Sequence, residues 1–134
     1  MSTGIGVLCS GPGLELYALI QAVHDGRLPA TIRLVICDSQ NSDVLTLARS
    51  NGLQAAFVPR GAFHANIDGY ERRLLEMMRE AQVEMVVLAG FARELGSVLN
   101  DAYPGQIVGR DLCPVRLVSE LESVLRKKLF TVVG

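Results

Sequence analysis

Residues Ile5–Val23 read IGVLCSGPGLELYALIQAV. The apolar run IGVLC is typical of a buried strand, and the residues from Glu15 onward have the apolar spacing of a helix. Between them, SGPG supplies two glycines, which permit a tight turn from a strand into a helix. A strand, a glycine turn and a helix begin a βαβ unit, so this stretch predicts an α/β fold with a parallel sheet.

The rest of the chain continues this alternation. The expected strands are 5–9, 31–38, 55–59, 85–90 and 106–108, and the expected helices are 15–25, 42–52, 66–82 and 92–105. Ser42 and Gly52 are the polar start and the glycine end of one helix, and Met77 and Met78 are expected in the core. The tail predicts a helix over 118–128 and a last strand over 129–134. The pattern predicts βαβ units and therefore an α/β fold with a parallel sheet.

Length and composition predict the general class of the protein. At 134 residues, 49% of them hydrophobic, the chain supports a single globular domain over 1–134. A net charge of −1 gives no electrostatic surface for nucleic acid, so we expect no nucleic-acid partner. No apolar stretch approaches the ~20 residues of a membrane helix, and the first residues do not resemble a secretory leader. We therefore expect a cytoplasmic protein without membrane contact.

The cysteines and histidines give no sign of a metal site. Cys9, Cys37 and Cys113 are odd in number and far apart, and only His24 and His64 could join them. We interpret Cys9 and Cys37 as small buried apolar residues and expect no metal.

The glycine loop resembles a phosphate-binding turn, but two of its residues oppose that function. Glycines and helix amides favour an anion at such a turn. Pro12 removes one amide donor, and the charge of Glu15 repels a phosphate at ~4 Å by about 1 kcal/mol in water. Alternatively, Glu15 stabilises its own helix through the dipole by about 0.3 to 1 kcal/mol and occupies the anion site. We favour this second interpretation over phosphate binding.

Three segments carry a family resemblance. GVLCSGPGLELYALIQAV, VEMVVLAGFARELGSVL and AYPGQIV, in this order, resemble the amino-terminal nucleotide-binding half of the phosphoribosylglycinamide formyltransferase (glycinamide ribonucleotide transformylase) family of purine biosynthesis. The resemblance runs from Ile5 to Val108. It implies a Rossmann-like formyltransferase fold, a mostly parallel sheet with helices on both faces, here truncated on its carboxy-terminal side. It also implies two small-molecule ligands, a ribonucleotide and the folate 10-formyltetrahydrofolate.

The resemblance assigns residues to both ligands. The first loop, which would hold the ribonucleotide phosphate, comprises Ser10, Gly11, Pro12, Gly13, Leu14 and Glu15. The folate side comprises Leu88, Ala89, Gly90, Phe91 and Ala92. The family's loop reads Ser-Gly-Asn-Gly-Ser-Asn-Leu, so this chain keeps both glycines but has lost the polar pair that follows the second one. The phosphate side is therefore expected to be impaired, and the folate side better retained.

The catalytic segment departs further from the family. Where the family reads Asn-Ile-His-Pro, this chain has Gly109, Arg110, Asp111 and Leu112. Neither a glycine side chain nor an ionised aspartate can donate a hydrogen bond to a developing oxyanion. Asp111, paired with Arg110, is our one catalytic candidate, and a surface turn with a local ion pair is the alternative that we favour.

Two further positions are assigned to structure. His64 matches no catalytic position and is expected in a solvated loop. The family often has an arginine near Asn66 that helps to hold the substrate, whereas Asn66 itself is a good helix cap.

Three functional hypotheses follow. The chain is a catalytically impaired relative that acts by binding or assembly, an active folate-dependent formyltransferase, or a truncated or frame-altered gene product whose residues after Val108 are foreign to the fold. We also expect a homodimer through the carboxy-terminal helix and strand, Val118 to Val133, because the apolar segment LFTVVG would need cover.

Overall fold

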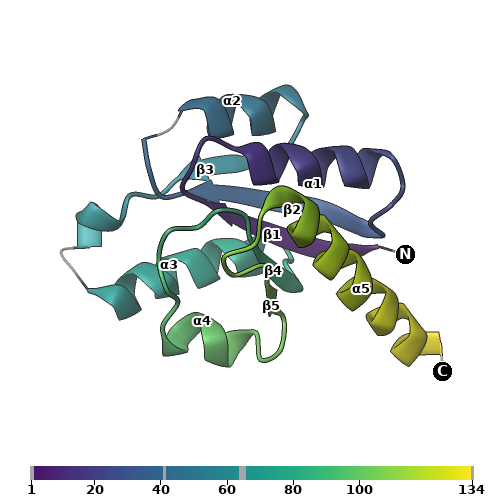
Figure 1. Ribbon diagram of the computed structural model, residues 1–134. Coiled ribbons are helices and arrows are strands. Elements are labelled where there is room, and N and C mark those ends of the chain that lie inside the picture. The colour runs from purple at the N-terminus through teal and green to yellow at the C-terminus, as the bar shows by residue number, and fades with distance from the viewer. Residues whose placement is uncertain (1, 41, 64–65, 134) are drawn as a thin grey trace.

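Five parallel strands form one sheet at the centre of the molecule. The computed structural model describes residues 2–40, 42–63 and 66–133. The strands are β1 (Thr3–Cys9), β2 (Ala30–Cys37), β3 (Ala55–Phe57), β4 (Met85–Leu88) and β5 (Ile107–Val108). They lie in the order β3-β2-β1-β4-β5, and every pairing between neighbours is parallel (Figure 1). The predicted Rossmann-like α/β fold is confirmed.

Helices cover both faces of this sheet, as the sequence predicts. One face packs against α1 (Leu14–His24), α2 (Ser42–Ser50) and α5 (Pro114–Val133). The other face packs against α3 (Ile67–Glu80) and α4 (Ser97–Ala102), and a short 3-10 turn, η1 (Arg60–Phe63), precedes α3. Figure 1 shows α1 and α2 above the strands and α3 and α4 below them.

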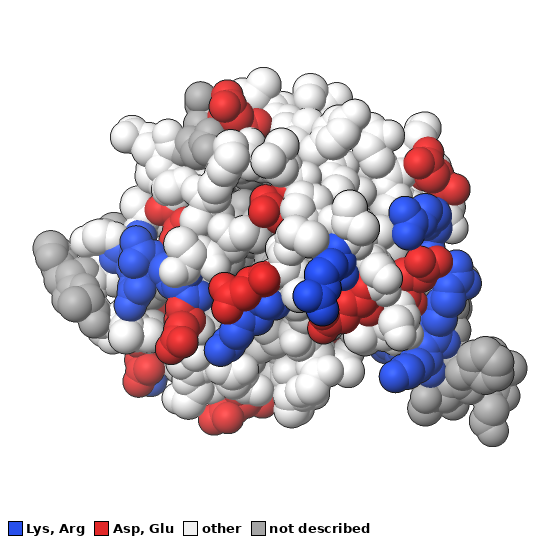
Figure 2. Space-filling model, viewed as in Figure 1, with Lys and Arg blue, Asp and Glu red and all other residues white. Residues whose placement is uncertain are grey.

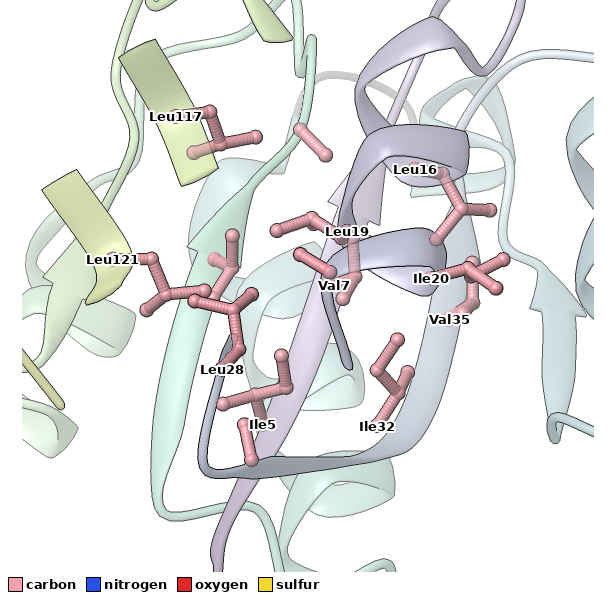
Figure 3. Close-up of a cluster of buried hydrophobic side chains, with 14 of the residues drawn as sticks. Ile5, Val7, Leu16, Leu19, Ile20, Leu28, Ile32, Val35, Leu117 and Leu121 are labelled. Atoms are coloured by element: carbon pink, nitrogen blue, oxygen red, sulfur yellow. The ribbon is translucent and has the colours of Figure 1, made fainter. Parts of the chain in front are cut away.

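The two cores follow directly from the apolar spacing. On the α1 side, Leu19 of α1, Leu121 of α5 and Val7 of β1 belong to one cluster of buried side chains, which Figure 3 shows. On the α3 side, Met78 is buried and Met77 is half-buried, which confirms the predicted core role of both methionines. All four residues of β4 are buried, because helices cover it on both faces.

The predicted carboxy-terminal strand is wrong. Residues 114–133 form the single helix α5, which replaces both the helix expected over 118–128 and the strand expected over 129–134. Residues 128–133 contain neither glycine nor proline, so the helix that packs on α1 through Leu117, Leu121 and Leu125 continues to Val133. Strand propensity in LFTVV is overridden by this continuity.

The homodimer was predicted because a carboxy-terminal strand would need cover, and these residues form part of the helix α5 instead. In the part of α5 whose side chains the structure describes, Leu117, Val118, Leu121 and Leu125 are buried within their own chain. The homodimer through Val118–Val133 remains a prediction without the strand that motivated it.

The helix expected over 92–105 is also shorter than predicted. Only Ser97–Ala102 is helical, and the five residues before it form a loop after β4. Two interactions explain this. The amide of Ala92 donates to Ser10 Oγ at 2.9 Å, and the carboxylate of Glu71 accepts the amides of Gly96 and Leu99. These hydrogen bonds hold the loop of residues 92–96 at its first and last residues.

The burial of two cysteines agrees with the expectation from the sequence. Cys9 and Cys37 are buried free thiols, as predicted, whereas Cys113 is exposed. Burial raises the pKa of the Cys9 thiol well above its ordinary value.

On the face shown in Figure 2, Lys and Arg side chains are interspersed with Asp and Glu side chains, so neither sign of charge dominates this face. Across the described residues, no helix is both long enough and apolar enough to cross a membrane, and no three potential metal ligands come together.

Candidate functional site at the carboxyl edge of the sheet

The loops that follow β1, β2 and β4 meet at one edge of the sheet. β1 lies between β2 and β4 in the strand order, so the chain changes direction across the sheet at this point. Ligands of open parallel sheets bind outside the carboxyl ends of the strands at such a point. Both segments that the resemblance assigns to ligands lie here.

The first loop keeps the glycine geometry of the turn. Gly13 has φ +96°, a left-handed conformation that favours glycine, and it caps α1 without a side-chain hydrogen bond. The residues on either side are exposed, and Leu14 has 65% of its surface in solvent. The loop therefore presents an apolar side chain where the family has a polar one.

Glu15 reaches across from this loop to the end of β4. A Cβ built on Gly90 would lie 3.0 Å from Glu15 Oε2. Among the described residues, the carboxylate of Glu15 accepts no hydrogen bond from the first amides of α1. Its negative charge lies between the first loop and the folate-side segment, close to both.

The folate-side residues divide into buried and accessible ones. Leu88 and Ala89 are buried in the two cores, with 4% and 1% of their surfaces exposed, so their side chains cannot contact a ligand. Gly90 is exposed in a left-handed conformation, with φ +73°, and Ala92 is exposed as well. Phe91 packs partly against the α3 side. Only the last three can present groups to a ligand.

A polar cluster that the sequence analysis missed links these loops. The Asp38 side chain, 3% exposed, accepts a hydrogen bond from Ser10 Oγ at 2.5 Å and one from Arg93 Nε at 2.8 Å. Asp38 directly follows a buried apolar strand, and the carboxyl ends of parallel strands share one edge. The position of Asp38 directly after a strand could have indicated from the sequence that it belongs to this site. Nothing in the sequence distinguished Arg93 in this way.

The segment at the family's catalytic position, which follows β5, contains two residues with positive φ angles. Gly109 has φ +105°, and a Cβ there would lie 2.5 Å from Leu117 Cδ1 and 2.7 Å from the backbone oxygen of Leu88. Asp111 is exposed with φ +57°, and in the described structure no ion pair joins it to Arg110. The backbone at residue 109 thus has no room for any side chain.

Two other sequence assignments have clear outcomes. Asn66 caps α3, because its side-chain oxygen accepts the Gly69 amide at 3.0 Å, which confirms the predicted cap. His64 and the side chain of Ser42 lie outside the described residues.

The described residues form one small hollow beside the folate-side segment. Beside Phe91 and Arg93, a hollow of about 10 Å³ lies against Tyr70 and Glu71 of α3. Larger hollows, of about 400 and 420 Å³, lie on the α1 side of the molecule, one at the amino end of β2 and one between α1 and α5.

Comparisons with known proteins agree with this geometry. The family model described as formyl transferase matches residues 4–109. The phosphoribosylglycinamide formyltransferase of Bacillus subtilis is 29% identical over 103 residues, which are 76% of this chain and 52% of that protein. The Escherichia coli protein of the same name is 31% identical over 104 residues, covering 78% of this chain and 49% of its own length.

A solved structure supports the same conclusion. The crystal structure of glycinamide ribonucleotide transformylase 1 from Symbiobacterium toebii matches with a TM-score of 0.76 and 30% identity, over 81% of this chain and 50% of that one. The chain thus spans about half the length of the relatives that it matches. The match to the family model, the shared sheet and the preserved glycine loop together establish that this chain belongs to the formyl transferase family.

Proposed function

We propose that this chain binds a reduced folate at the carboxyl edge of its sheet and does not catalyse formyl transfer, acting instead by binding or assembly. The observation that carries the proposal is Gly109, where a Cβ would overlap Leu117 and the Leu88 backbone. A donor side chain cannot occupy this position without a shift of the backbone. Transfer of a formyl group needs such donors, because negative charge develops on the formyl oxygen in the transition state.

The folate side supports binding of a flat ring. Gly90 is exposed, and the Glu15 carboxylate lies where its side chain would stand, with Oε2 3.0 Å from the position of a Cβ. The Glu15 carboxylate beside it can accept hydrogen bonds from the ring N–H groups of a reduced folate. The same carboxylate repels a phosphate at the first loop. 10-formyltetrahydrofolate is therefore the ligand that we favour, and the ribonucleotide is disfavoured.

A second candidate is an active folate-dependent phosphoribosylglycinamide formyltransferase. The printed names of the bacterial relatives favour it. For either candidate we propose a cytoplasmic location, since the free cysteines Cys9, Cys37 and Cys113 suit a reducing compartment.

Calorimetric titration tests the proposed ligand preference. We expect the chain to bind a reduced folate and to show no binding of glycinamide ribonucleotide at the same concentration. In Glu15→Asn, the affinity for the ribonucleotide or for inorganic phosphate should rise about tenfold, which corresponds to ~1.4 kcal/mol, because one like charge is removed.

Glu80→Asn is the matched control for this titration. It makes the same change in net charge, but Glu80 ends α3 shortly before β4 begins and so lies at the opposite edge of the sheet. Its phosphate affinity should stay at that of the unaltered chain. Tight binding of the ribonucleotide by the unaltered chain, without folate binding, would refute the proposal.

A further inference from the structure

Ser10, in the first loop, forms hydrogen bonds with residues that follow β2 and with residues that follow β4. Its amide donates to the carbonyl oxygen of Gly90 at 3.2 Å, and its hydroxyl oxygen accepts the amide of Ala92 at 2.9 Å. The hydroxyl itself donates to Asp38 Oδ1 at 2.5 Å, and the carbonyl oxygen of Ser10 accepts the hydroxyl of Ser39 at 2.5 Å. One residue therefore connects the loop after β1 to the loops after β2 and β4.

Asp38 fixes the direction of this hydroxyl. Because its carboxylate can only accept, the Ser10 proton must point toward Oδ1, which leaves a lone pair of Ser10 Oγ for the Ala92 amide. The other carboxylate oxygen accepts from Arg93 Nε at 2.8 Å, and Arg93 comes directly after Ala92 in the chain. Hydrogen bonds to a carboxylate are stronger than those between neutral groups. Two adjacent residues of the folate-side loop are thus held by one buried carboxylate.

We propose that Ser10 and Asp38 are positioning residues, which hold the Gly90–Ala92 backbone in the conformation that a reduced folate binds. This inference rests on the proposed function, since it concerns the same ligand. Neither side chain needs to contact the folate. Both act through the backbone that it contacts, so the first loop retains a role at the folate side even where it binds no phosphate.

Two measurements on the full chain test the proposal. Hydrogen exchange of the Ala92 amide, followed by NMR, reports the bond to Ser10 directly and needs no ligand. Calorimetry reports the affinity for a reduced folate. In Ser10→Ala, we expect Ala92 exchange to accelerate by about tenfold or more and folate affinity to fall by about tenfold. Ser10→Thr, which keeps the hydroxyl, should restore both values to within about threefold of the unaltered chain.

Asp38→Asn provides an independent variant. Its amide oxygen can still accept from Ser10, but the charge that holds Arg93 is gone, so intermediate changes in both measurements are expected. Ser119→Ala, at an exposed position of α5, is the control and should change neither.

The outcomes separate this inference from the proposed function. Unchanged Ala92 exchange in Ser10→Ala, or faster exchange with unchanged folate affinity, overturns the positioning role. If the unaltered chain binds no reduced folate at all, the proposed function fails, and with it the role in folate binding. Ala92 exchange then still shows whether Ser10 holds this loop.

Discussion

Gly109→Asn, which restores the residue that the family has at this position, is expected to destabilise the protein by about 3 kcal/mol and to create no activity. A Cβ would lie 2.5 Å from Leu117 Cδ1 and 2.7 Å from the Leu88 backbone oxygen. Overpacking of this kind costs ~1 to 3 kcal/mol, and a left-handed conformation in a residue other than glycine costs ~1 kcal/mol or more. Urea denaturation followed by circular dichroism measures the change.

Gly105→Asn is the matched control. Gly105 also has a left-handed conformation, with φ +69°, but no atom lies within 4 Å of its Cβ position. Its loss of stability should stay near 1 kcal/mol or below, because only the conformational cost applies and asparagine tolerates this region. If the two variants lose equal stability, the segment after β5 can relax, and the argument from Gly109 against catalysis fails.

Glu71→Ala should have a similarly large effect, a loss of about 2 to 4 kcal/mol. Glu71 has 2% of its surface exposed, and its carboxylate accepts the amides of Gly96 and Leu99 at the start of α4. Truncation leaves two amide donors without their acceptor, at ~1 to 3 kcal/mol each when buried. Thermal and urea unfolding both report the loss.

Glu76→Ala, on the same helix, separates this effect from a general change in charge. Glu76 forms an exposed pair with Arg73, and its side chain is 62% exposed. Its removal should change stability by less than about 0.5 kcal/mol. Equal losses in the two variants would mean that the cap of α4 contributes little.

The order of strands and helices was predictable because the chain repeats one physical pattern. Buried runs such as Ile5–Cys9 alternate with amphipathic segments, and this alternation alone specifies a parallel α/β sheet. The ends of elements were less predictable. LFTVV has strand propensity, but it continues a helix that already packs on α1, and packing outweighs local propensity.

The candidate site was predictable only in outline. The glycine loop was found from its two glycines between a strand and a helix, and the segment after β4 was found from its resemblance to the family. Arg93 was missed because its contact with Asp38 joins residues 55 apart in sequence, which no local pattern reveals, whereas the position of Asp38 directly after a buried strand was a signal that the sequence analysis did not use. Leu88 and Ala89 were assigned to the folate side from their place in a motif, whereas burial removes their side chains from any ligand.

Formyl transfer itself tests the central claim most directly. The purified chain is incubated with 10-formyltetrahydrofolate and glycinamide ribonucleotide, and formylated ribonucleotide is quantified against a reaction without protein. The Escherichia coli phosphoribosylglycinamide formyltransferase, which is 31% identical, provides the positive control. We predict no product above the protein-free rate from a preparation that binds a reduced folate by calorimetry. Product that increases in proportion to the concentration of this chain would contradict the account.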